Sequence, residues 1–137
     1  MVRRFQAGRG SRGFTLIELM IVISLLLILL TIAIPIYNQA ILRAKESVLR
    51  QDLFTLRQVI DQYTLDKQKA PQSLDDVISA GYLKQLPHDP FTGKNDTWAV
   101  VQEDDTLLDP NQTAGGINDV HSGSNLTASD GTAYSTW

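Results

Sequence analysis

A predominantly apolar run of 23 residues near the start of the chain sets the strongest limit on its fold. From Phe14 to Ile36 the sequence reads FTLIELMIVISLLLILLTIAIPI, and Glu18 is the charged residue in it. As a helix this run would be roughly 35 Å long, enough to cross a hydrocarbon core of about 30 Å. A core helix that is apolar on every side is the alternative, but it would need a larger protein around it. We therefore expect a membrane helix over residues 14–36.

Charge is distributed unevenly before and after this helix. Residues 1–13 hold four Arg and no acid, whereas the remainder holds 15 Asp and Glu against eight Lys and Arg, a formal net of −7. Nucleic-acid binders carry their basic surface on the folded part, so no nucleic-acid partner is expected. A basic start is typical of a targeting signal. An ordinary signal peptide, however, has a shorter apolar region followed by small residues at its cleavage site. In this chain the apolar run is longer and no such small-residue site follows it.

The junction between the basic leader and the apolar helix reads GFTLIE, from Gly13 to Glu18. An acidic residue inside a membrane helix costs about 2.5–3.5 kcal/mol at mid-helix and by default marks function. The Arg-rich leader, the Gly-Phe pair and a Glu at the fifth position of the apolar run together resemble the type IV prepilin family. That family includes the pseudopilins of type II secretion.

The resemblance implies how the N-terminus is processed. A membrane-embedded prepilin peptidase would remove the leader, residues 1–13, by cutting after Gly13 on the cytoplasmic face. The new amino group of Phe14 would then be methylated. Gly13 suits a protease subsite that has no room for a Cβ.

The resemblance also assigns assembly roles to Glu18 and Pro35. In such families the Glu pairs with the N-terminal amine of a neighbouring subunit, and a buried carboxylate is tolerated where a cation is supplied. The alternative for Glu18 is a side chain near the headgroups that simply reaches water. Pro35 removes the hydrogen bond to the carbonyl of Thr31, and it either kinks the helix or marks its exit from the membrane.

Residues 37–137 are expected to form a head, which gives the chain an α+β, pilin-like fold. The long N-terminal helix should continue past the membrane and stop before Pro71. Charged residues such as Arg43, Glu46, Arg50, Arg57 and Asp61 are expected on its solvent side. Apolar residues recur at steps of three and four, the spacing of a stripe that packs on a small antiparallel sheet: Ile41, Ala44, Val48, Leu49, Leu53, Leu56, Val59, Ile60 and Tyr63.

The rest of the head is predicted from local signals. A short second helix should start after Ser73, with Asp76 completing a capping box, and end at Gly81. Residues 98–101 have strand character, and the chain after Glu103 is rich in turn formers and expected to be loop-like.

A turn with the sequence LPHDPF, residues 86–91, follows the second helix. This proline–Asp–proline–aromatic turn resembles the major pseudopilin of type II secretion, the G subunit, more than a pilus pilin. Many pilus pilins close their C-terminal region with a disulfide, which is impossible in a chain without Cys.

The G pseudopilins bind calcium in a C-terminal loop, so the resemblance implies oxygen ligands within residues 117–132. Calcium takes six to eight oxygens, and this segment has only two carboxylates where the family has an acidic run. The alternative is a polar turn satisfied by its own side chains. No other cofactor is expected, and no constellation predicts catalysis. The candidate calcium ligands are Asp119, Ser122, Ser124, Asn125 and Asp130.

The resemblance implies a structural subunit of a type II secretion pseudopilus, a periplasmic filament that promotes protein export. The chain would cross the inner membrane once, with its N-terminus cytoplasmic and its head periplasmic. Its partners would be further copies in a helical filament, the lipid bilayer, the prepilin peptidase, the inner-membrane secretion platform and minor pseudopilins. Two alternatives remain: a type IV pilus pilin, and a monomeric signal-anchored binding module, for which Glu18→Ala would leave function intact.

Overall fold

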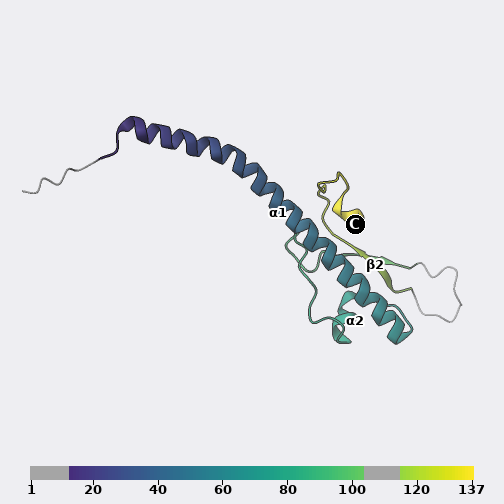
Figure 1. Cartoon of the computed structure of the whole chain (residues 1–137). Coiled ribbons are helices and arrows are strands. Elements are labelled where there is room, and N and C mark those ends of the chain that lie inside the picture. The colour runs from purple at the N-terminus through teal and green to yellow at the C-terminus, as the bar shows by residue number, and fades with distance from the viewer. Residues whose placement is uncertain (1–12, 104–114) are drawn as a thin grey trace, which may run out of the picture. The chain divides into compact units, whose positions relative to one another are not determined.

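One long helix, α1 (Leu16–Lys67), contains the apolar segment and continues into the head (Figure 1). The computed structural model describes residues 13–103 and 115–137, so residues 1–12 of the expected leader lie outside the described part. The chain divides into two compact units, Met1–Gln39 and Ala40–Trp137. As predicted, α1 ends before Pro71, and Gln68 follows it with a positive φ of 55°.

In the first unit, all described residues are exposed. The two hydroxyls in the apolar part of α1 are satisfied within the helix, since Ser24 donates to the Met20 carbonyl and Thr31 to the Leu27 carbonyl, both at 2.7 Å. This matters in lipid, where no water can pair with a free polar group. Pro35 lies within α1, so it does not end the helix.

The second unit is a small α+β head. Besides α1 it contains α2 (Leu74–Ser79), the strands β1 (Ala99–Gln102) and β2 (Ile117–His121), and the 3₁₀ helix η1 (Tyr134–Thr136). The expected start of α2 is confirmed, because the Asp76 carboxylate accepts from the Ser73 N–H at 3.0 Å. Its expected end is confirmed too, with Gly81 at a φ of 84°, a conformation that glycine adopts without strain.

The predicted stripe of α1 is confirmed over its second half, where Leu49, Leu53, Leu56 and Ile60 are at most 2% exposed. The prediction is wrong for the first residues of the stripe, because Ile41 and Val48 are 38% and 49% exposed. The stripe packs with residues from β2 and the C-terminal segment into one core. That core also contains Trp98, Ile117, Val120, Ala128 and Tyr134.

The two strands pair antiparallel, as expected, but β2 corrects the prediction of a loop after Glu103. The pairing shifts between Val101, opposite Asp119, and Gln102, opposite Ile117, so Asn118 is an extra residue on β2. Such a bulge breaks the alternation of faces along a strand. Ile117 and Val120 are therefore both buried although they are three apart, and no period of two is visible in the sequence. The turn formers predicted between residues 104 and 114 lie outside the described residues.

Glu46 corrects the expectation that the charges of α1 face solvent. It is 6% exposed and accepts three hydrogen bonds, from the Ser129 N–H at 2.7 Å, the Ser129 hydroxyl at 2.6 Å and the Tyr134 hydroxyl at 2.9 Å. The bonds from Ser129 contribute most to holding the pKa of Glu46 below its ordinary value, against the effect of burial. Burial, with the Glu46 carboxylate second, raises the pKa of Tyr134 to about 12. Glu46 thus anchors the C-terminal segment to α1.

Replacing Leu53 by Ala should lower the free energy of unfolding of the head by about 2–5 kcal/mol, because it leaves a cavity in the core. Trp98 and Trp137, the two Trp of the chain, both belong to the head, so fluorescence of the full-length protein in detergent micelles reports its unfolding. Phe54→Ala, at a neighbouring side chain that is 62% exposed, is the control and should shift stability by less than about 0.5 kcal/mol. Equal effects of the two variants would contradict the assigned core.

Replacing Glu46 by Gln should destabilise the head at neutral pH by about 1–3 kcal/mol, since three donors lose a charged acceptor. Because the folded-state pKa of Glu46 lies below its ordinary value of 4.5, its contribution is complete above about pH 5 and is lost as the pH falls through the folded-state pKa. The difference between wild type and variant in urea unfolding should therefore shrink on acidification. Asp61→Asn, on an exposed part of α1, should show no such pH-dependent difference.

Candidate functional site

The junction selected from the sequence forms the start of α1. Thr15 directly precedes the helix; its hydroxyl accepts from the Glu18 N–H at 3.2 Å and its carbonyl accepts from the Leu19 N–H at 3.1 Å. Thr15 is therefore the N-cap, which satisfies a backbone N–H that the first turn leaves without a partner. The sequence analysis missed this role, although the Thr-x-x-Glu spacing from Thr15 to Glu18 is its signal.

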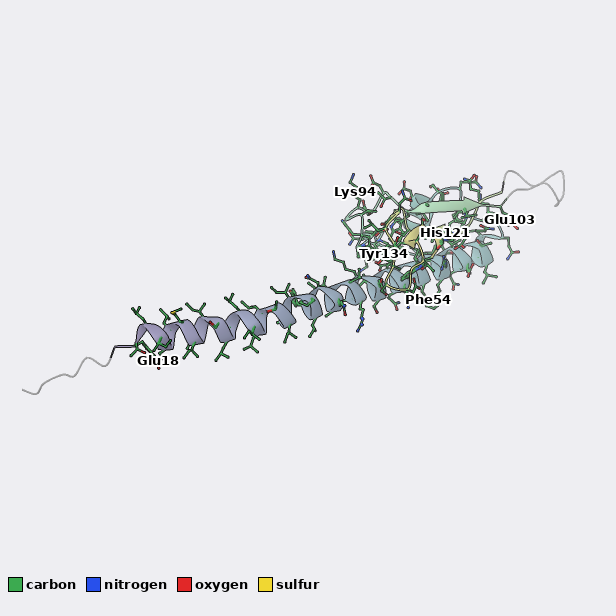
Figure 2. All side chains as sticks on the ribbon, turned by 90° about the horizontal axis from the view of Figure 1, so that it is seen from above. Glu18, Phe54, Lys94, Glu103, His121 and Tyr134 are labelled. Atoms are coloured by element: carbon green, nitrogen blue, oxygen red, sulfur yellow. The ribbon has the colours of Figure 1, made fainter. Side chains whose placement is uncertain are left out.

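Glu18 lies in the first turn of α1, and Figure 2 shows it at the start of the helix. A carboxylate is favoured there, because the unpaired N–H groups give this end a partial positive charge. The cap thus fixes both where α1 begins and where its acidic residue stands. Phe14, the residue before the cap, is 86% exposed.

Gly13 is exposed as well, in the non-helical residues before the cap. A Cβ added to it would meet no described atom within 4 Å, and its φ is not in the left-handed region. The folding of the described residues does not require glycine at this position.

The apolar part of α1 also meets the criteria for a membrane span. Among the described residues, α1 is long and apolar enough to cross a bilayer, and an 18-residue window within it has a mean hydropathy of 3.0. Its large apolar side chains are exposed, from 46% for Val22 to 83% for Leu16. These features fit the expected membrane anchor.

The candidate calcium ligands are distributed over different elements. Asp119 lies in β2, where one carboxylate oxygen accepts from Arg57 Nε at 2.6 Å and from the Val120 N–H at 2.7 Å. His121 Nε2 lies 3.6 Å from the other oxygen. Burial raises the pKa of Asp119, but the Val120 N–H and the Arg57 guanidinium outweigh it and keep this pKa below its ordinary value.

Ser122 and Ser124 form a second group, around Asp89 of the double-proline turn. Ser122 is fully buried; its hydroxyl donates to Asp89 Oδ2 at 2.5 Å and accepts from the Ser124 N–H at 3.1 Å. The other carboxylate oxygen of Asp89 accepts from the Phe91 N–H at 2.8 Å. Asp89 is 0% exposed. The sequence analysis used it only as part of a family pattern and missed its structural role.

Asp130 and Asn125 are both exposed and take no part in these two groups of hydrogen bonds among the described residues. Asp130 accepts from the N–H and the hydroxyl of Thr132, and these bonds, the hydroxyl first, hold the pKa of Asp130 below its ordinary value. The structure therefore brings Ser122 and Ser124 together but places Asp119 and Asp130 in other networks. Within residues 13–103 and 115–137, no three His, Cys, Asp or Glu side chains are grouped to hold a metal ion.

Comparison with known proteins bears on the junction first. Residues 8–34 match the model of the prokaryotic N-terminal methylation motif. This match contains Gly13, Phe14 and Glu18, together with most of the exposed apolar run. The chain is also similar to the type IV major fimbrial protein FimA of Dichelobacter nodosus, with 43% identity over 45% of this chain and 39% of that protein.

The longer matches extend into the head. Type II secretion system core protein G of Klebsiella pneumoniae is 32% identical, over 59% of this chain and 69% of its own length. The protein of that name from Pseudomonas aeruginosa is 32% identical, over 61% and 70%. The one from Pectobacterium carotovorum is 31% identical, and the match spans 65% of its length, slightly under two thirds.

No solved structure matches the chain significantly. The prepilin-type junction, the pilin-like α+β fold and the extended matches to core protein G agree with one another. The chain therefore belongs to the family of the type II secretion system core protein G, within the type IV prepilin-like superfamily.

Proposed function

We propose that this chain is the structural subunit of a type II secretion pseudopilus, and that copies of it assemble through α1 into a periplasmic filament that promotes protein export. The observation that carries the proposal is the start of α1: a capped helix end that presents one acidic residue, Glu18, ahead of a long exposed apolar run. In this proposal the chain works by packing against its own copies and not by catalysis of its own.

The exposed apolar side chains of α1 must be shielded from water in every state of the protein. In the membrane, lipid chains cover it, because every side of the helix is apolar. Once the head moves away from the membrane, the same side chains would be exposed to water. This exposure would cost a free energy of about 25 cal/mol for each Å² of apolar surface. Helices of neighbouring copies are the matching apolar partner, so extraction from lipid favours a bundle of such helices.

Glu18 gives that bundle its register. An ionised carboxylate among apolar helices is tolerated only beside a cation. Removal of the leader would create a new amino group on Phe14, and a neighbouring copy can bring this amine to Glu18. A type IV pilus pilin would use the same contact, but the similarity to the fimbrial protein covers less than half of either chain. A monomeric binding module would have no use for it.

The remaining partners follow from this assembly. The prepilin peptidase would cut after Gly13, and the secretion platform of the inner membrane and minor pseudopilins would start and drive the filament. The basic leader of residues 1–13 is expected on the cytoplasmic side, where the prepilin resemblance puts the peptidase cut. The charge of the flanks adds little to this, because Arg43, Lys45 and Arg50 follow the apolar run. The head is then periplasmic and the chain crosses the membrane once.

Processing should be abolished in Gly13→Leu. Mass spectrometry of the wild type should give a chain that starts at methylated Phe14, whereas the variant should keep its leader. Because a Cβ at residue 13 meets no described atom, loss of cleavage would reflect the peptidase and not misfolding. Gly10→Leu, the same change inside the leader, should be processed normally. A wild-type chain that still begins at Met1 would contradict the prepilin assignment.

Replacing Glu18 by Gln should abolish filaments while leaving membrane insertion and cleavage intact. Gln keeps the size of the side chain, and the hydrogen bond from the residue 18 N–H to Thr15 does not involve it. The change therefore removes the charge alone. Shearing cells and imaging the released filaments measures assembly, and membrane fractionation measures insertion. Ser24→Ala, which removes another polar group of α1, is the control and should still assemble; normal filaments from Glu18→Gln would refute the register contact.

A further inference from the structure

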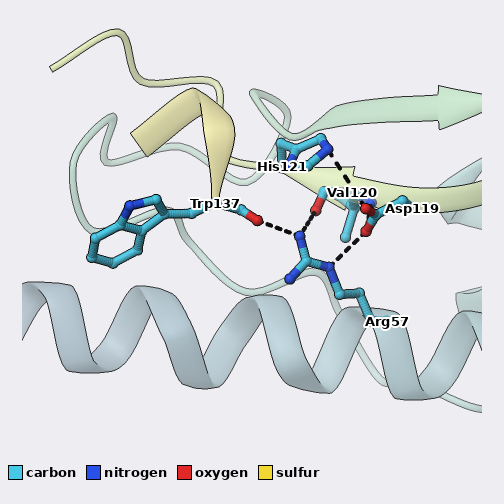
Figure 3. A network of polar contacts seen from close by, with 5 residues as sticks. All are labelled: Arg57, Asp119, Val120, His121 and Trp137. Carbon is cyan, nitrogen blue, oxygen red and sulfur yellow. Dashed lines mark hydrogen bonds and ion pairs between the residues drawn. The ribbon is translucent and has the colours of Figure 1, made fainter. Parts of the chain in front are cut away.

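Arg57 donates hydrogen bonds to oxygens of two separate segments of the head. Its Nε donates to Asp119 Oδ1 at 2.6 Å, and its Nη2 donates to the Val120 carbonyl at 2.9 Å and to the Trp137 oxygen (Figure 3). One side chain of α1 thus holds β2 and the end of the C-terminal segment together. Arg57 was expected on the solvent side; its side chain is 37% exposed, but its guanidinium is bound to these oxygens, which the sequence did not indicate.

A second cationic side chain, Arg50, also contacts the C-terminal segment at Trp137. The guanidinium carbon of Arg50 lies 4.4 Å from the centre of the Trp137 ring, a cation–π contact. Arg50 and Arg57 are seven residues apart, two turns of α1, so both project toward the same side of the helix. Trp137 is held by one arginine at its ring and by the other at its backbone.

Four of the five candidate calcium ligands, all except Asn125, already form side-chain hydrogen bonds within the described part of the head. The Asp119 oxygen nearest Arg57 accepts from two donors, and an ion placed beside it would be repelled by the guanidinium charge. The Ser122 hydroxyl is directed to Asp89, and Asp130 forms a turn with Thr132. Calcium takes six to eight oxygens in one shell, and the five candidate ligands do not form such a shell.

We propose that the Arg57 guanidinium takes the place of the calcium ion that the family resemblance implies, so that this head folds and keeps its C-terminal segment in place without a metal. An arginine suits that task, because its fixed fork of five N–H donors binds several oxygens at once and its charge is permanent. Glu46 complements it, since it binds donors of the same segment at Ser129 and Tyr134. The proposal concerns the head alone and does not depend on filament assembly.

The first experiment uses only the wild type, as the full-length chain in detergent micelles. Thermal unfolding of the head is followed by Trp fluorescence in EDTA and in millimolar calcium chloride. A ligand that binds the folded state raises its Tm by mass action. We expect the two Tm values to agree within about 1 °C. A calcium-dependent rise of several degrees would overturn the proposal, whatever any variant does.

The second experiment tests Arg57 itself. Arg57→Gln should lower the Tm of the head by about 4–8 °C or more, equally in EDTA and in calcium. Arg57→Lys should recover only part of the loss, because a point charge cannot bind the three oxygens as the fork does. Arg43→Gln, at an exposed position of the same helix, is the matched control and should change the Tm little. If Arg57→Gln matched this control, the proposal would be wrong.

Discussion

A single helix that must satisfy two different solvents is the constraint on which the rest of the structure depends. In its first part α1 is apolar all around and exposed, from Leu16 through the residues near Pro35. In the head the same helix buries only one stripe, centred on Leu49, Leu53 and Leu56. The first part is suited to lipid and to other helices, the second to one layer of strand and loop. Of the nine described residues in the core cluster, α1 supplies four, and the segments that follow it supply the other five.

Local signals were enough for the parts of the fold whose causes are local. A helix over the apolar run, the end of α1 before Pro71 and the cap of α2 at Ser73 each depend on signals within a few residues, and these three predictions are confirmed. The bulge in β2 has no such signal, since Asn118 is an ordinary polar residue until its pairing with β1 is known. A strand with two core residues three apart looks like a loop when only its own residues are considered.

The candidate site likewise combines features that have a local sequence signal with features that depend on distant partners. The segment from Gly13 to Glu18 was singled out from the sequence and lies within the matched methylation motif, while its cleavage stays a prediction and the capping role of Thr15 was missed. The charges that organise the head were not identified, because a charged residue on an amphipathic helix normally faces water. The partners of Glu46 are 83 and 88 residues away, and Asp119 is 62 residues from Arg57. Contacts over such separations leave no local pattern, so the calcium ligands expected from the family were assigned without knowledge of their actual partners.

The open space around Gly13 has a consequence for how this family can vary. A core position such as Leu53 is restricted by the molecule itself, and its substitutions are filtered by folding in any cell. If the peptidase proposed to cut after Gly13 is what requires glycine there, a host whose peptidase accepts a larger residue would release that requirement without any change in the core. The junction and the head would then answer to different partners.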